Sequence, residues 1–131
     1  MNMIRIQWSE TQPVIEVTNS EELEDALEKI GSQVRPDHPM IIFVNAHGYR
    51  VILGIGYEES FLQFELESGD PPYLATVGNP NIQGVVAFYL FGDHHTEIRR
   101  RNLIPTARAR AVLAEWIKTA IRPIDIEWEE I

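Results

Sequence analysis

Apolar residues are most concentrated in the middle of the chain, where residues 51–67 predict two antiparallel strands. The first strand is an apolar run with Gly54 and Gly56 at its far end. Polar residues 57–60 interrupt the pattern, and residues 61–66 resume it. This hairpin is the predicted centre of a sheet.

Strands are also predicted on both sides of this hairpin. Near the N-terminus, Ile4 and Ile6 alternate with polar residues. Residues 14–17 follow Pro13, which cannot donate a hydrogen bond within a sheet, so this short strand is expected at an edge. The first strand of the hairpin extends back to residue 49, and the remaining strands are predicted at residues 40–46, 73–77, 85–91 and 124–128.

Three segments of the C-terminal half differ in pattern. Residues 85–91 are continuously apolar, which predicts a strand buried on one or both faces. Residues 92–102 are polar and are predicted to be irregular. Ile124, Ile126 and Trp128 alternate with acidic residues, which predicts a half-buried final strand.

A first amphipathic helix is predicted from residue 21. Thr18 is followed three residues later by Glu21, which matches a capping box, and Gly31 is a typical C-terminal stop. Acidic residues crowd the first turn, where they complement the helix dipole, and they are expected to form a solvated face. The buried face is predicted to consist of Leu23, Ala26, Leu27 and Ile30.

A second helix has the strongest helical periodicity in the chain. Thr106 is placed to cap its start, and Pro123 is expected to end it. Its apolar face is predicted to consist of Ala109, Val112, Leu113, Trp116, Ile117 and Ala120.

The order of elements predicts the fold class. Strands come first, then a helix, a run of five strands, a second helix and a last strand. Strands joined by short turns pair antiparallel, so both helices should pack together on one face of the sheet. The prediction is a single α+β domain over residues 1–131, with a mainly antiparallel sheet of about six to seven strands.

Composition narrows the classes of partner. The 20 acidic residues outnumber the 11 Lys and Arg residues, which gives a net charge of −9. This charge repels phosphate backbones and anionic lipids, so neither nucleic acid nor a membrane is an expected partner, whereas a basic protein is. The alternative is that the charge serves only to keep a small protein soluble.

Cysteine usage and the N-terminal sequence point to the cytoplasm. The chain has no cysteine, which excludes disulfides, thiolate zinc ligands and cysteine nucleophiles. The N-terminal residues lack the apolar segment of a signal peptide, and no run approaches the roughly 18 apolar residues of a membrane span. A cytoplasmic protein is expected.

Histidine and serine supply the candidate chemistry for an enzyme. His94 and His95, with Asp93 and Glu97, could bind a metal ion, but nothing else in the sequence supplies the fixed array of three ligands and their supporting groups that a catalytic site needs. His47 and Ser60 could act as base and nucleophile, but no known nucleophile motif surrounds Ser60. A hydrolase would need these groups to converge in one pocket with a carboxylate. No catalytic residue, cofactor or metal site is therefore predicted.

The charge distribution suggests a binding surface instead. Residues 51–98 contain seven acids and no Lys or Arg, and basic residues cluster from Arg99 onward. A localised negative surface attracts a positively charged partner and accelerates its association. The alternative is a solvated sheet face whose countercharges come from the arginine-rich segment. The predicted contact residues are Tyr57, Glu58, Glu59, Glu65, Glu67, Asp70 and Tyr73.

A spaced pattern of motifs over residues 21–128 resembles the first-numbered family of bacterial polymorphic-toxin immunity proteins. In chain order the motifs are EELEDALEKI, LGIGYEESFLQFE, PYLATVG, VVAFYLFG and IPTARARAVLAEW, followed by Trp128. The resemblance implies a small cytoplasmic protein that binds and neutralises a cognate toxin domain and is not itself an enzyme.

The resemblance also implies a kind of toxin. Members of this family often neighbour toxins of the nucleic-acid deaminase type, which tend to be basic around the active site. An acidic protein in the substrate channel would then take the place of phosphate. The expected partner is a basic toxin domain, bound by a monomer or weak dimer through the predicted contact residues.

Two alternatives remain open. The competing toxin-binding site is segment 93–101, where His94 and His95 could enter a cleft. The competing function is that of a secretion chaperone, which would form a stable homodimer with an exposed apolar groove.

Overall fold

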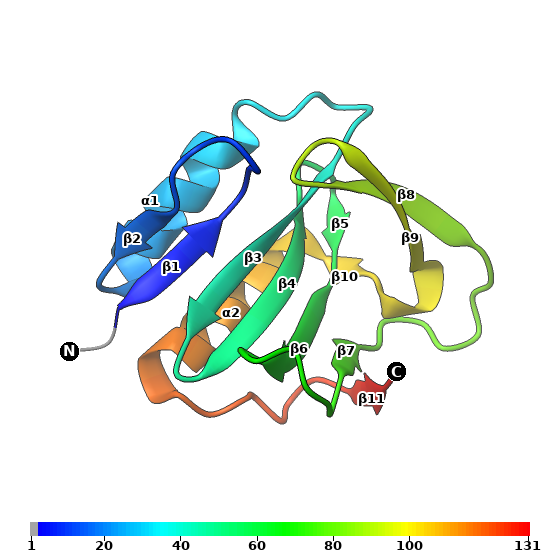
Figure 1. Ribbon diagram of the computed structural model, residues 1–131. Coiled ribbons are helices and arrows are strands. Elements are labelled where there is room, and N and C mark those ends of the chain that lie inside the picture. Colours follow the sequence, from blue (N-terminus) through cyan, green and yellow to red (C-terminus); the bar gives the residue numbers. More distant parts are fainter. Residues whose placement is uncertain (1–2) are drawn as a thin grey trace.

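A computed structural model describes residues 3–131 (Figure 1). It contains two α-helices, one short 3-10 helix and eleven strands among these residues. The helices are α1 (Ser20–Gly31), η1 (Arg100–Asn102) and α2 (Thr106–Thr119). The strands are β1 (Ile4–Gln7), β2 (Ile15–Val17), β3 (Met40–Ala46), β4 (Tyr49–Ile55), β5 (Glu59–Ser60), β6 (Leu62–Leu66), β7 (Leu74–Thr76), β8 (Val85–Leu90), β9 (His94–Arg99), β10 (Ile104–Pro105) and β11 (Trp128–Glu130).

Nine strands form one sheet. Seven of them lie in the order β11-β7-β6-β4-β3-β1-β2, and β8 joins β3 in parallel and carries β9 on its other side. The predicted α+β class is confirmed, as are the central β4–β6 hairpin and the edge position of β2. The sheet has nine strands, more than the six to seven predicted, and β9 is the one at which no strand was predicted. The two-residue strands β5 and β10 were also missed, and they pair with each other outside the sheet.

Both helices cover the same face of the sheet, as predicted (Figure 1). Alternation along the strands places a cross-strand row of apolar side chains under them: Ile6, Val44, Val51, Phe64 and Leu74. Trp116 of α2 lies edge-on to Phe64, with ring centroids 5.1 Å apart. This face holds the main hydrophobic core.

A smaller core lies on the other face, under the β8–β9 hairpin. Its buried members are Ile41, Phe61, Phe88 and Leu103. Gly54 makes this packing possible, because a Cβ atom there would lie 2.5 Å from the Phe88 ring. The glycine therefore lets the ring lie directly on β4.

The start of α1 differs from the prediction by one residue. Asn19, not Thr18, is the N-cap: its extended backbone directs Oδ1 to the Glu22 amide, 2.8 Å away. The Glu22 carboxylate in turn accepts hydrogen bonds from the amide and hydroxyl of Thr18, at 2.8 and 2.6 Å. Asparagine caps as well as threonine does, and here it displaces the predicted Thr18–Glu21 box.

The ends of α2 also differ from the prediction. Thr106 is the first helical residue, and its hydroxyl donates to the Tyr57 carbonyl instead of capping the helix. Ala120 is exposed and lies beyond the last helical residue, with φ +60°. The helix therefore ends before Pro123. The other five residues of the predicted apolar face are buried.

The prediction of an irregular segment at residues 92–102 was wrong. Most of it is β9, which pairs with β8 along its whole length, and the rest is η1. The polar side chains of β9 face solvent at a sheet edge, so they lack the apolar alternation of a half-buried strand. In β8 only Phe88 is fully buried, because the strand touches β3 at just two register positions.

The prediction of a final strand from Ile124 was also wrong. The strand β11 covers only Trp128–Glu130, and Ile124 is the most exposed large apolar side chain among the described residues. The partner strand β7 has three residues and ends at Thr76, opposite Trp128. One further backbone bond, from the Val77 amide to the Glu127 carbonyl at 2.9 Å, leaves Ile124 beyond the pairing. Neither helix is long and apolar enough to cross a membrane.

Candidate partner-binding site

Six of the seven predicted contact residues fall into two groups at opposite ends of β4 and β6. Tyr57, Glu58 and Glu59 follow β4 and lead into β5. Glu67, Asp70 and Tyr73 lie in and after the turn that follows β6 (Figure 1). Since β6 has five residues and a strand rises about 3.3 Å per residue, roughly 16 Å of strand separate the groups. They do not form one continuous patch.

The first group lies against the start of α2. The Glu58 carbonyl accepts the Thr106 amide hydrogen at 3.0 Å, and the Tyr57 carbonyl accepts the Thr106 hydroxyl hydrogen at 2.6 Å. Glu58 is exposed, and Glu59 is half-buried beside Pro105 of β10. The backbone of this group is thus fixed, while the Glu58 carboxylate is available to a partner.

The second group lies in a compact turn. The Tyr73 hydroxyl donates to the Gly69 carbonyl at 2.6 Å, and the Ser68 hydroxyl donates to Asp70 Oδ2 at 3.0 Å. The Glu67 amide donates to the Gly48 carbonyl at 3.0 Å, which attaches this turn to the β3–β4 turn. Glu67 and Asp70 are both exposed.

Glu65 differs from the other predicted acids. It lies on the sheet face away from the helices, and it is only 9% exposed. Its Oε2 atom lies 2.9 Å from Nη2 of Arg50, its cross-strand neighbour. Most of its charge is therefore neutralised within the protein.

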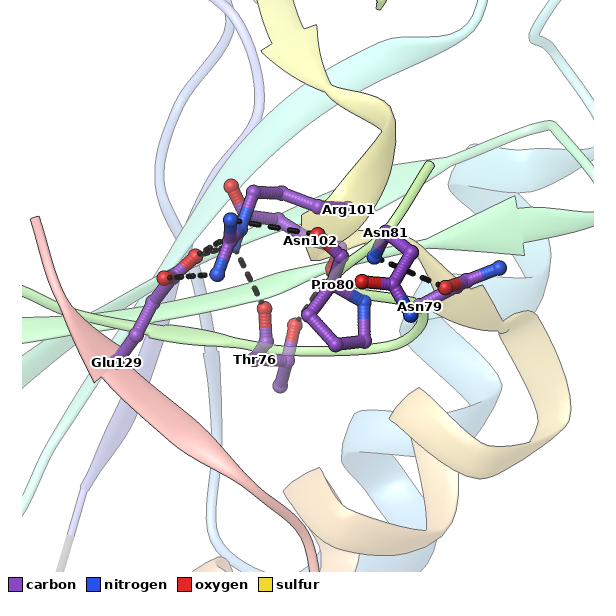
Figure 2. Close-up of polar contacts among 7 residues, drawn as sticks. All are labelled: Thr76, Asn79, Pro80, Asn81, Arg101, Asn102 and Glu129. Carbon is purple, nitrogen blue, oxygen red and sulfur yellow. Dashed lines mark hydrogen bonds and ion pairs between the residues drawn. The ribbon is translucent and has the colours of Figure 1, made fainter. Parts of the chain in front are cut away.

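The arginine-rich segment does not neutralise the predicted acids. Among residues 3–131, Glu58, Glu59, Glu67 and Asp70 form no ion pair. Arg101 instead pairs with Glu129 of β11 through two hydrogen bonds, of 3.1 and 2.9 Å (Figure 2). The alternative in which this segment supplies the countercharges is thus wrong for Arg101.

Figure 2 shows a network around Arg101 that the sequence analysis missed. Buried Asn102 donates one amide hydrogen to the Thr76 carbonyl at 2.9 Å and the other to Glu129 at 2.6 Å. The Thr76 hydroxyl donates back to the Asn102 carbonyl at 2.9 Å. These bonds join β7, η1 and β11, so we assign the network a structural role. No sequence motif marks it, because its members lie far apart along the chain.

The candidate enzymatic groups do not converge. His47, in the β3–β4 turn, has Nε2 3.0 Å from the Ile117 carbonyl and its ring edge-on to Trp116. Ser60 is buried beyond the other end of β4 and donates to the Gly54 carbonyl at 2.7 Å.

The other two candidate histidines are also remote from His47. His94 and His95 lie on β9, whose partner β8 joins β3 at the end opposite His47, and His94 pairs with Glu10. Within residues 3–131, no group of three or more His, Cys, Asp or Glu side chains could hold a metal ion. The arrangement required of a histidine hydrolase is therefore not present among these histidines.

Two surface hollows provide room for a partner. The larger, about 830 Å³, lies between α1 and α2 and has acidic side chains of α1 on one side and alanines of α2 on the other. The smaller, about 340 Å³, lies at the C-terminal end of α2 and is lined by Phe64, Trp116 and Ile124, among others. Neither was predicted, because each is formed by residues from separate elements.

Comparison with models of known protein families identifies the family of this chain. A search of curated proteins found no similar protein. The model of the family described as Immunity protein Imm1 matches residues 6–130, which is almost the whole chain. The match confirms the resemblance that the motifs indicated, and this chain belongs to the Imm1 family of immunity proteins.

Proposed function

We propose that this protein binds a secreted toxin domain in the cytoplasm of the producing cell and blocks the toxin's active site. The toxin is of the nucleic-acid-targeting class, a deaminase or nuclease, and is basic where it holds its substrate. Membership of the Imm1 family supports the neutralising role. The immunity protein acts by binding and performs no catalysis.

One observation carries the electrostatic part of this proposal. Glu58, Glu59, Glu67 and Asp70 have no ion-pair partner among residues 3–131, in a protein of net charge −9. Such carboxylates can pair with the Lys and Arg side chains that would otherwise hold phosphate. Complementary charge mainly accelerates association and selects the partner.

The two groups of predicted residues have different roles in this proposal. Glu67, Asp70 and Tyr73 form the main contact, because their turn lies next to the hollow at the end of α2. Tyr57, Glu58 and Glu59 form a second contact at the other end of the sheet. Glu65 contributes indirectly, since its pair with Arg50 holds the strand that carries both groups.

Two double variants, each of which replaces two acidic residues with lysine, test these roles. We expect the partner to be the C-terminal toxin domain of a secreted protein encoded beside this chain, and this domain is refolded after separation from the complex for the test. We expect Glu67→Lys with Asp70→Lys to slow association at least tenfold at low salt, with a smaller effect at high salt. Glu58→Lys with Glu59→Lys should have a smaller effect of the same sign.

The matched control reverses two exposed acids elsewhere, Glu16→Lys with Asp37→Lys. It makes the same change in net charge, so an equal loss of association rate would contradict a localised site. His94→Ala with His95→Ala tests the competing site on β9, and should leave binding unchanged. Co-expression tests the function itself, and growth arrest despite the wild-type protein would refute neutralisation.

Sedimentation distinguishes the alternative secretion-chaperone function. We expect a monomer or weak dimer that binds the folded toxin domain. A stable homodimer that binds only unfolded segments would favour the chaperone.

A further inference from the structure

The connection between α2 and β11 exposes two isoleucines to solvent. We call residues 120–125 the isoleucine loop: Ile124 is 89% exposed and Ile121 is 69% exposed. Tyr49, at the start of β4, is 40% exposed and lines the same hollow. Single exposed apolar residues are ordinary, but three around one hollow form a patch of the kind that proteins use as binding sites.

The loop is held in place by contacts on both sides of Ile124. The Trp128 indole N–H donates to the Pro123 carbonyl at 2.7 Å. The Arg108 guanidinium donates to the Asp125 carboxylate at 2.9 Å and to its carbonyl at 3.3 Å. The exposure of Ile124 is therefore a property of an anchored backbone.

The other half of the loop is anchored as well. The Thr119 hydroxyl lies 3.2 Å from both the amide nitrogen and the carbonyl oxygen of Ile121. The Arg122 guanidinium lies 5.4 Å from the centre of the Trp128 ring. A loop that already has its bound shape loses little conformational entropy when a partner covers it.

The hollow beside the loop can receive an apolar side chain. Its volume is about 340 Å³, near the lower end for small-molecule pockets, and buried aromatic rings of Phe64 and Trp116 line it. Ile121 and Ile124 form its outer wall. An apolar centre with a charged rim is the usual anatomy of a protein interface.

The rim indicates the charge of the partner. Glu67 adjoins Tyr49, because its amide bonds to Gly48 and Leu66 pairs with Tyr49 across the sheet. Asp70, in the same turn as Glu67, is also exposed. Arg122, the basic residue that lines the hollow, stacks on Trp128. The rim therefore favours a basic partner.

We propose that the isoleucine loop and its hollow are the hydrophobic anchor for the cognate toxin domain. The toxin would insert an apolar side chain that is flanked by Lys or Arg residues. This inference rests on the proposed function and adds to it the apolar contact that the carboxylates cannot supply. Hydrophobic anchors mainly slow dissociation, whereas the acidic rim mainly accelerates association.

Serine substitutions test the anchor against the toxin domain encoded next to this chain. We expect Ile121→Ser and Ile124→Ser each to weaken binding about tenfold, and the pair about 100-fold, through faster dissociation. The urea midpoint of the free protein should stay unchanged, because both side chains are exposed. The matched control is Val14→Ser with Val85→Ser, two apolar residues that are 47% and 50% exposed, one just before β2 and the other at the start of β8.

Several outcomes would overturn the anchor. Suppose that the double variant Ile121→Ser, Ile124→Ser binds the toxin like the wild type, and that the double variant Glu67→Lys, Asp70→Lys binds it weakly. The isoleucine loop is then not the anchor, and the proposed function stands. If the control loses as much affinity, the effect is general and the loop is not the anchor. If the wild type forms a dimer that the isoleucine pair dissociates, and toxin affinity is unchanged, the loop binds a second copy. If the wild type binds no toxin, both proposals fail.

Discussion

Arg50 and Glu65 face each other across β4 and β6, with Nη2 and Oε2 2.9 Å apart, on the sheet face away from the helices. The guanidinium also lies over the Phe43 ring, 5.0 Å from its centre. Since Glu65 is almost fully buried, removal of its carboxylate leaves a mostly desolvated guanidinium without its partner.

We therefore expect Glu65→Ala to lower the free energy of unfolding by about 2–4 kcal/mol in urea denaturation. The control is Glu67→Ala, two residues away and exposed, which should change stability by less than about 0.5 kcal/mol. An equal loss of stability in the two variants would mean that the ion pair between Glu65 and Arg50 does not stabilise the protein.

Trp116 is the largest fully buried side chain, and its ring contacts His47 and Phe64. We expect Trp116→Ala to cost about 3–5 kcal/mol, because the vacated space lies between α2 and the sheet. Urea denaturation measures the loss. A loss below about 1 kcal/mol would place Trp116 at the surface and not in the core.

Asn102 satisfies two acceptors with its amide group, the Thr76 carbonyl and the Glu129 carboxylate (Figure 2). Asn102→Asp keeps the shape but presents oxygen atoms to both acceptors. We expect a loss of about 2–4 kcal/mol at neutral pH, measured by thermal or urea unfolding. The control is Asn81→Asp, at an exposed position. An equal loss of stability in this variant would mean that the hydrogen bonds of Asn102 are not the cause.

Gly78 approaches the backbone of a neighbouring segment too closely for any side chain. A Cβ atom there would lie 1.9 Å from the Leu103 carbonyl oxygen, so Gly78→Ala must displace backbone. We expect it to destabilise the protein by about 3 kcal/mol. Gly31→Ala provides the contrast, since Ile55 lies 4.0 Å away and alanine favours helices, so stability should be unchanged or higher.

The Glu22 carboxylate predicts a pH effect. Its hydrogen bonds from the hydroxyl and amide of Thr18 hold the pKa of Glu22 below its usual range in the folded state. A lowered pKa contributes stability at neutral pH, and this contribution disappears as pH falls through the folded-state value.

Glu22→Gln should therefore lower stability at neutral pH and flatten its decline between about pH 5 and pH 2. Urea midpoints across this range measure both effects. The control is Glu21→Gln, whose carboxylate receives no such bonds among the described residues. An unchanged slope in Glu22→Gln would mean that Thr18 does not stabilise the charged form.

Local pattern predicted the parts of the fold that depend on one face being buried. The apolar faces of both helices and the β4–β6 hairpin follow from periodicity, because each element buries one side in the same core. Strand β9 could not be found in this way, since it lies at an edge with polar side chains on its surface. The α1 cap was off by one residue because Thr18 and Asn19 are both good caps.

The candidate site was predictable as a set of residue types but not as a surface. Glu58, Glu67 and Asp70 are exposed, and Glu65 is not, although all lie in one acidic stretch of sequence. Burial of Glu65 depends on its register opposite Arg50, and pairing register is set by contacts between strands.

The sequence by itself determined the family, the negative charge and the two apolar helix faces, because composition and spacing are carried by the chain. Only the tertiary structure decided that the predicted acids lie at two ends of the sheet and that Ile124 is exposed. Ile124 belongs to the same alternation of apolar and acidic residues as Trp128, yet β7 is too short to pair with Ile124. A strand forms only where a neighbour supplies hydrogen-bond partners, so the same alternation gives a buried Phe64 in β6 and an exposed Ile124 in a loop.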